Sequence, residues 1–143
     1  MAGVIEALAK NLPPDERKWT VLGGVSAGSV TLAELMMFPI GQEIEASEYT
    51  RDLWKGIRSK DIYSSWGKGL IYAFFKSHSL LNTDPLLDFM MKILKDRTMQ
   101  RHFTISMGNL NKGWVNVVSD LNSTYWKDIA YYIVVSSSIP AIF

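Results

Sequence analysis

Apolar residues recur at helical spacing over several stretches of the chain and run continuously over others. Val4, Ile5, Leu8 and Leu12 share one face of a predicted helix, which the Pro13-Pro14-Asp15 turn ends. The run from Trp19 to Gly23 predicts a strand. Similar patterns predict further helices over residues 30–38, 42–60, 84–94 and 124–136.

Two shorter apolar runs predict a pair of strands late in the chain. Residues 102–107 and 114–118 alternate enough to form strands, and Asn109 to Gly113 have the composition of a hairpin turn. A helix, a strand and a second helix follow one another in the first 38 residues, which is typical of an α/β layer with a parallel sheet. The 143 residues therefore predict one α/β domain.

Two apolar segments have less regular patterns. Residues 67–75 predict either a buried helix or a lid-like segment. Leu35 to Ile40 and Leu70 to Phe75 contain flexible methionines or aromatic rings, which suit contact with acyl chains. The alternative to acyl-chain contact is that both segments are packed in the hydrophobic core.

The chain's best candidate for chemistry lies between the first strand and the helix after it. Gly24-Val25-Ser26-Ala27-Gly28, here called the elbow, has the spacing of a nucleophile elbow. A serine at such a sharp turn adopts a strained backbone, and glycines two residues away avoid collisions with the strand and helix. The next helix begins beside the hydroxyl, and its N-terminus favours negative charge. The alternative is a turn in which Ser26 only caps the helix.

Several motifs together resemble the patatin-like phospholipases. They are the elbow, the Asp84-Pro85-Leu86 helix start and the ending Ser136-Ser137-Ser138-Ile139-Pro140-Ala141-Ile142-Phe143. The resemblance implies a three-layer αβα sandwich with a mainly parallel central sheet. It also implies a serine lipid acyl hydrolase that uses a Ser–Asp dyad, no catalytic histidine and no cofactor. Ser26 would be the nucleophile, Gly24 and Gly28 would shape the elbow, and the Ala27 N–H would contribute to the oxyanion hole.

The same resemblance implies that residues 1–143 are a partial domain. The family's glycine-rich oxyanion loop would lie before Met1, and its Asp-Gly motif would follow Phe143. The sequence contains no Asp-Gly dipeptide. A serine hydroxyl needs a base within hydrogen-bond reach, so Ser26 without these parts would be close to inert. One alternative is therefore an inactive remnant or interaction module. Another is an α/β-hydrolase triad formed by Ser26, an aspartate and His102.

The composition indicates which binding partners the chain is expected to have. Lys and Arg number 15 against 14 Asp and Glu, and no basic block indicates nucleic-acid binding. The chain has no cysteine, and its two histidines and its acidic residues lack metal-ligand spacing, so no metal site is expected. No signal peptide or membrane-spanning run is readable. The expected partner is a lipid or acyl ester, with possible peripheral membrane contact and a cytoplasmic or membrane-peripheral location.

Overall fold

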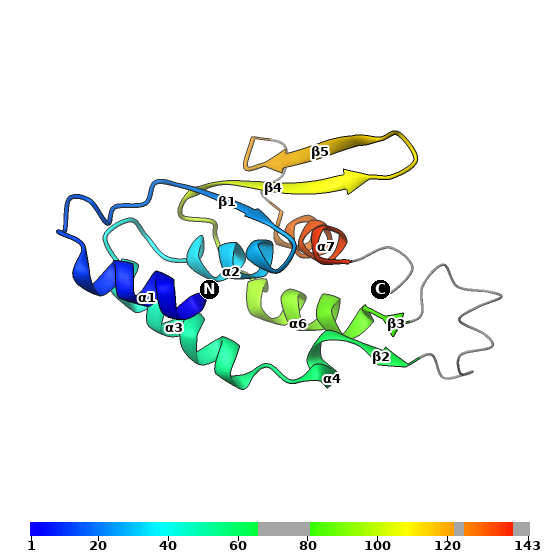
Figure 1. Cartoon of the computed structure of the whole chain (residues 1–143), viewed down its shortest axis with the longest axis horizontal. Helices are drawn as coiled ribbons and strands as arrows, with labels where there is room; N and C mark the ends of the chain where they lie inside the picture. The colour runs from blue at the N-terminus through cyan, green and yellow to red at the C-terminus, as the bar shows by residue number, and fades with distance from the viewer. Residues whose placement is uncertain (66–80, 122–124, 139–143) are drawn as a thin grey trace.

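The computed structural model describes residues 1–65, 81–121 and 125–138, which form a mixed α/β fold (Figure 1). The helices of these residues are α1 (Ala2–Asn11), α2 (Ala27–Leu35), α3 (Glu43–Gly56), α4 (Ser59–Ile62), α6 (Asp84–Leu94) and α7 (Trp126–Ser137). Their strands are β1 (Val21–Val25), β2 (Ser64–Ser65), β3 (Leu81–Asn82), β4 (His102–Asn109) and β5 (Trp114–Ser119). Apart from the helix expected over residues 42–60, the helices and strands expected from the apolar patterns within these ranges are present, with bounds shifted by a few residues.

The main sheet is small and mixed. Its strand order is β1-β4-β5, with β1 parallel to β4 and β4 antiparallel to β5. Val21 lies opposite His102 at one end of the parallel pair, and Val25 lies opposite Ser106 at the other. The antiparallel pair follows from the short turn between β4 and β5, because a connection of this length can only reverse the chain. Strands β2 and β3 form a separate antiparallel ribbon.

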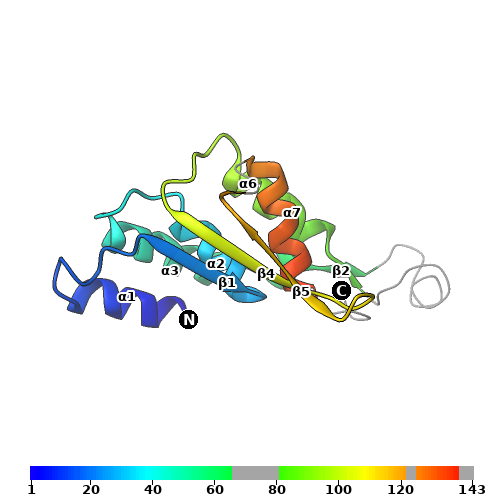
Figure 2. The ribbon, with the colours of Figure 1, turned by 90° about the horizontal axis from the view of Figure 1, so that it is seen from above.

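One face of the sheet is packed against helices in two tiers. Helices α2 and α7 lie directly against β1 and β4, and α3 and α6 lie behind them, with α1 against α3 (Figures 1 and 2). The core forms between the sheet and these helices. Its largest fully buried apolar side chains are Phe103, Ile105, Met36, Met90, Leu94, Ile129 and Ile133.

The opposite face of the sheet carries no helix from the described ranges. Val21, Val25, Val115 and Val117 on β1 and β5 are each more than half exposed. The expected three-layer sandwich with a mainly parallel sheet is therefore not confirmed. What the structure shows is a three-stranded mixed sheet with helices on one side.

Three local expectations need correction or cannot be followed. The helix expected over residues 42–60 is divided, because Ile57 and Arg58 are extended and the Arg58 N–H donates to Asp61 Oδ2 at 2.9 Å to start α4. The sequence predicts Asp84 as the N-cap of the next helix and Pro85 as its first residue, whereas in the structure α6 begins at Asp84 and its N-cap is Thr83. The segment 67–75 lies outside the described residues, as does His78, the second histidine besides His102. Within those residues, none of the helices has the length and apolar character needed to cross a membrane.

Candidate active site

Ser26 connects the end of β1 to the start of α2 in a strained conformation. Its φ of 55° and ψ of −134° lie where residues other than glycine are rarely found. The side chain is exposed and occupies the N-cap position, yet it makes no capping hydrogen bond to the helix. The alternative that Ser26 is simply a capping serine is thus not supported by its geometry. Strain of about 1–3 kcal/mol persists only where surrounding contacts impose it.

Those contacts come from other serines. The Ser26 N–H donates to Ser136 Oγ at 2.9 Å, and Ser136 Oγ donates to the Ser106 carbonyl on β4 at 2.7 Å. The Ser26 carbonyl accepts hydrogen bonds from the hydroxyls of Ser137 and Ser29. The C-terminal turn of α7 therefore holds both backbone polar groups of Ser26. The sequence places Ser136 and Ser137 in a recognisable motif, but their bonding to the elbow is visible only in the structure.

The two glycines of the elbow have different roles. A Cβ on Gly24 would lie 2.8 Å from both Gly28 O and Ser29 Cα. These are backbone atoms, which cannot move away without distorting β1 or α2. The close approach of β1 to α2 thus requires glycine at position 24, as the spacing predicts. A Cβ on Gly28 would meet only Met1 Cε at 3.9 Å. The expectation that both positions exclude a side chain is wrong for Gly28, because α2 leaves open space there.

This difference gives a matched pair of variants. Gly24→Ala should lower the free energy of unfolding by about 1–3 kcal/mol, since the backbone of β1 or α2 must shift. Gly28→Ala should leave it unchanged or raise it by up to about 1 kcal/mol, because alanine is the better helix former. Urea unfolding followed by circular dichroism measures both. Equal losses for the two variants would show that the close approach at Gly24 is not the controlling contact.

An apolar cavity of about 240 Å³ opens beside Ser26. Ser26, Ala27 and Val30 line it from the elbow and α2, and Trp54 lines it from α3. The Trp54 indole N–H donates to Thr31 Oγ1 at 3.2 Å, which fixes the ring. The remaining lining residues are Ile57, Ile62, Thr83, Leu86 and Ser137. The sequence indicates the apolar stripe of α3 but not that Trp54 and Ile57 face this serine.

The polar environment of the cavity is limited. Ala27 and Gly28 are the first residues of α2, so their N–H groups have no partner within the helix and point toward the region of Ser26. None of the described residues that line the cavity has a titratable side chain. Nor do the described ranges contain a group of three His, Asp or Glu side chains that could hold a metal ion. The arrangement offers a hydroxyl, helix N–H groups and an apolar cavity.

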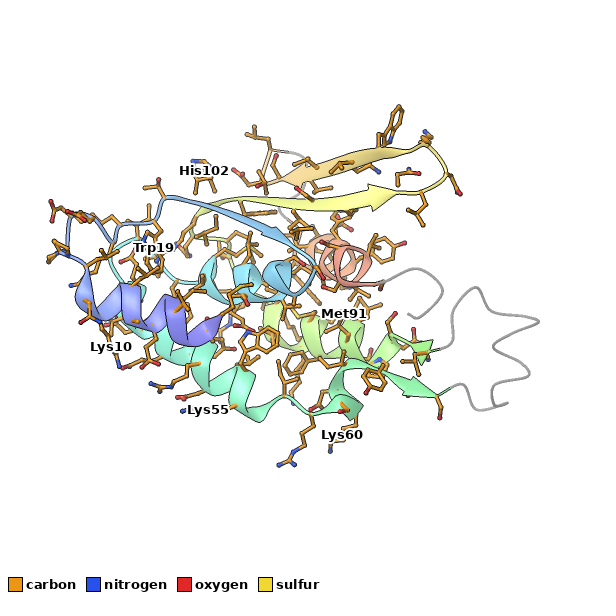
Figure 3. All side chains as sticks on the ribbon, in the orientation of Figure 1. Lys10, Trp19, Lys55, Lys60, Met91 and His102 are labelled. Carbon is orange, nitrogen blue, oxygen red and sulfur yellow. The ribbon has the colours of Figure 1, made fainter. Side chains whose placement is uncertain are left out.

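His102 lies at the opposite end of the strands from Ser26 (Figure 3). The parallel register separates them by on the order of 15 Å along β1 and β4. His102 Nδ1 instead lies 2.7 Å from Asp120 Oδ2, and this hydrogen bond lowers the pKa of the Asp120 carboxyl. A triad of Ser26, an aspartate and His102 is therefore wrong for this chain.

The apolar segment from Leu35 to Ile40 does not line the cavity either. Leu35 and Met36 are buried in the core at the C-terminal end of α2, one helix length from Ser26. The core alternative is correct for these two residues. Leu70 to Phe75 lies outside the described residues.

Comparisons of the chain with protein-family models, with curated proteins and with solved structures found no match. Function is therefore inferred from the residues and geometry of the chain itself.

Proposed function

We propose that this chain is the nucleophile-bearing part of a serine lipid acyl hydrolase of the patatin type. The observation that carries the proposal is the conformation of Ser26. Its backbone is strained, its hydroxyl is not used in capping, and it lies at an apolar cavity beside the start of α2. The hydroxyl of a serine held in this way can be reached by the carbonyl carbon of a substrate, as acyl transfer requires.

In the proposed reaction, Ser26 Oγ attacks the carbonyl carbon of an acyl ester, and the alcohol leaves. Water then hydrolyses the acyl-serine and releases the fatty acid. The Ala27 N–H would donate to the oxyanion that forms, and each such donor contributes roughly 10²–10³ in rate. The fatty-acyl chain would occupy the cavity against Val30, Trp54 and Leu86. The base proposed from the family resemblance is an aspartate outside residues 1–143.

A fluorophosphonate probe tests the nucleophile directly, because it phosphonylates only an activated serine. In a form of the protein that includes the proposed aspartate, we expect labelling of Ser26, found by peptide mass spectrometry, and its complete loss in Ser26→Ala. Residues 1–143 alone should label slowly, because the described cavity lining holds no base. Ser64→Ala, an exposed serine on β2, should label like the unchanged protein. The absence of labelling in the folded form that includes the aspartate would contradict the proposed hydrolysis.

One observation favours a second candidate, an acyl-binding module without catalysis. The described lining of the cavity holds no group that could take the Ser26 proton. Such a module would bind a fluorescent fatty acid equally well with serine or alanine at position 26, and it would not react with the probe. Leu86→Asp, which places a negative charge in the cavity, should abolish fatty-acid binding under either candidate in a variant that circular dichroism shows to be folded.

A further inference from the structure

The turn between β4 and β5 presents large apolar side chains to solvent. Leu110 is 72% exposed and Trp114 is 56% exposed. The turn is nevertheless ordered by its own hydrogen bonds: Gly113 N–H donates to the Asn109 carbonyl at 2.9 Å, and Lys112 N–H donates to Asn109 Oδ1 at 3.1 Å. Gly113 has a φ of 67°, which suits glycine in this turn. We call Leu110, Lys112 and Trp114 the hairpin tip.

The hairpin tip lies at the same end of the sheet as Ser26. Val25, the last residue of β1, pairs with Ser106, and β4 continues beyond it to Asn109. This extension is roughly 10 Å at the rise of a strand. The hairpin accordingly reaches past the end of β1 in both ribbon views (Figures 1 and 2). A surface touched by the tip would be on the side of the molecule where the cavity beside Ser26 lies.

The charge of the hairpin favours an anionic surface. Residues 102–119 contain no aspartate or glutamate. Lys112 Nζ lies 5.0 Å from the centre of the Trp114 ring, so a cation and an amphipathic aromatic ring share the tip. Tryptophan and lysine together are typical of the region where lipid head groups meet acyl chains.

The other end of the sheet has exposed apolar residues but a different charge. Leu121 is 89% exposed and Tyr125 is 51% exposed. Asp120 and Asp128 lie close to them in the chain and outnumber Lys127, whose Nζ lies 5.8 Å from the centre of the Tyr125 ring. An anionic bilayer would therefore on balance repel this end. The two ends of the sheet do not differ in having exposed apolar side chains, but they do differ in charge.

We propose that the hairpin tip docks this chain on an anionic lipid bilayer. Leu110 and Trp114 enter the interface, and Lys112 lies at the level of the head groups. The proposal deepens the proposed function, on which it rests, by identifying how the acyl hydrolase would reach its substrate. Docking through the tip would place the bilayer at the end of the sheet where Ser26 lies.

The test is sedimentation with vesicles of phosphatidylcholine and phosphatidylserine, with all variants made on Ser26→Ala so that no lipid is consumed. Leu110→Asp should weaken binding by about tenfold or more, because it removes a leucine from the interface. Lys112→Gln should weaken it by about fivefold on these vesicles and not on pure phosphatidylcholine. Leu121→Asp is the matched control, with the same substitution at a more exposed leucine at the other end, and should bind as before.

Three results would overturn the proposal. They are no vesicle binding by the parent protein, binding that survives Leu110→Asp, and an equal or larger loss with Leu121→Asp. Sedimentation velocity without lipid identifies the rival occupant, a second copy of the chain, because a dimer broken by Leu110→Asp would change mass. Vesicle binding that depends on Leu110, in a form that includes the proposed aspartate but does not react with fluorophosphonate, would uphold lipid docking while contradicting hydrolysis.

Discussion

Arg101→Met should lower the free energy of unfolding by about 3–5 kcal/mol, because it breaks a buried ion pair and leaves one charge without a partner. The Arg101 side chain is 1% exposed, and its Nη1 lies 2.8 Å from Glu43 Oε1, which is equally buried. The same guanidinium donates at 2.8 Å to the carbonyls of Trp19, Phe38 and Pro39. One side chain thus joins the segments before β1, after α2 and at the start of α3.

Burial opposes the charge on Glu43, but hydrogen bonds from the Gly41 N–H and from Arg101 more than offset it and hold the pKa of Glu43 below its ordinary value. Removing Arg101 takes away the guanidinium and leaves the buried Glu43 carboxylate without its charged partner. Domains of this size are stable by only about 5–15 kcal/mol, so the loss is a large share of the total.

Urea unfolding measures the Arg101→Met effect, with Arg97→Met as the matched control on an exposed arginine. The control should change stability by no more than about 0.5 kcal/mol. In the double variant Arg101→Met/Glu43→Gln, the loss of stability should be smaller than the sum of the losses in the two single variants. The reason is that Glu43→Gln removes the buried charge that Arg101→Met leaves unpaired. Full additivity would mean that Arg101 acts through the three carbonyls and not through Glu43.

The sequence predicts the elements near Ser26 because their signals are local. The apolar run before Gly24, the glycine at position 24 and the helix that ends at Leu35, a few residues before Pro39, each depend on neighbours in the chain. The hairpin around Gly113 is equally local, since its turn chemistry sets the pairing of β4 and β5.

Features set by distant contacts could not be predicted in this way. Periodicity does not say whether both faces of a sheet are covered, and here α2 and α7 pack on one face. The bonding of Ser136 to the Ser26 N–H joins residues 110 positions apart. Gly28 matches a pattern without meeting the crowding that the pattern implies. Arg101 belongs to no sequence motif, and its importance for stability follows entirely from the buried groups that it contacts in the fold.

Glu34 should make the protein less stable as pH rises through neutrality. Its carboxyl group is fully buried on α2, and neither oxygen forms a hydrogen bond to a described residue. Burial raises its pKa to about 8, and the nearby Thr50 hydroxyl on α3 offsets part of that rise. The charge that Glu34 would carry also contributes, after burial, to raising the pKa of Tyr49. At neutral pH the folded protein therefore holds Glu34 protonated.

The sign of the pH effect follows from proton binding. Between the ordinary glutamate pKa of 4.5 and about 8, the unfolded chain has lost this proton and the folded chain keeps it. Raising the pH then favours the unfolded state, by at most about 5 kcal/mol across the interval. Below this interval both states are protonated, and above it both are ionised, so the contribution of Glu34 no longer changes.

Glu34→Gln removes the ionisable group while keeping its size, so the variant should be stabilised more strongly at pH 8 than at pH 5. Urea unfolding at pH 5, 6.5 and 8 measures the difference, which should widen by several kcal/mol across the series. Glu45→Gln, on the exposed side of α3, should follow the unchanged protein at every pH. Parallel curves for Glu34→Gln and the unchanged protein would show that Glu34 ionises normally in the fold.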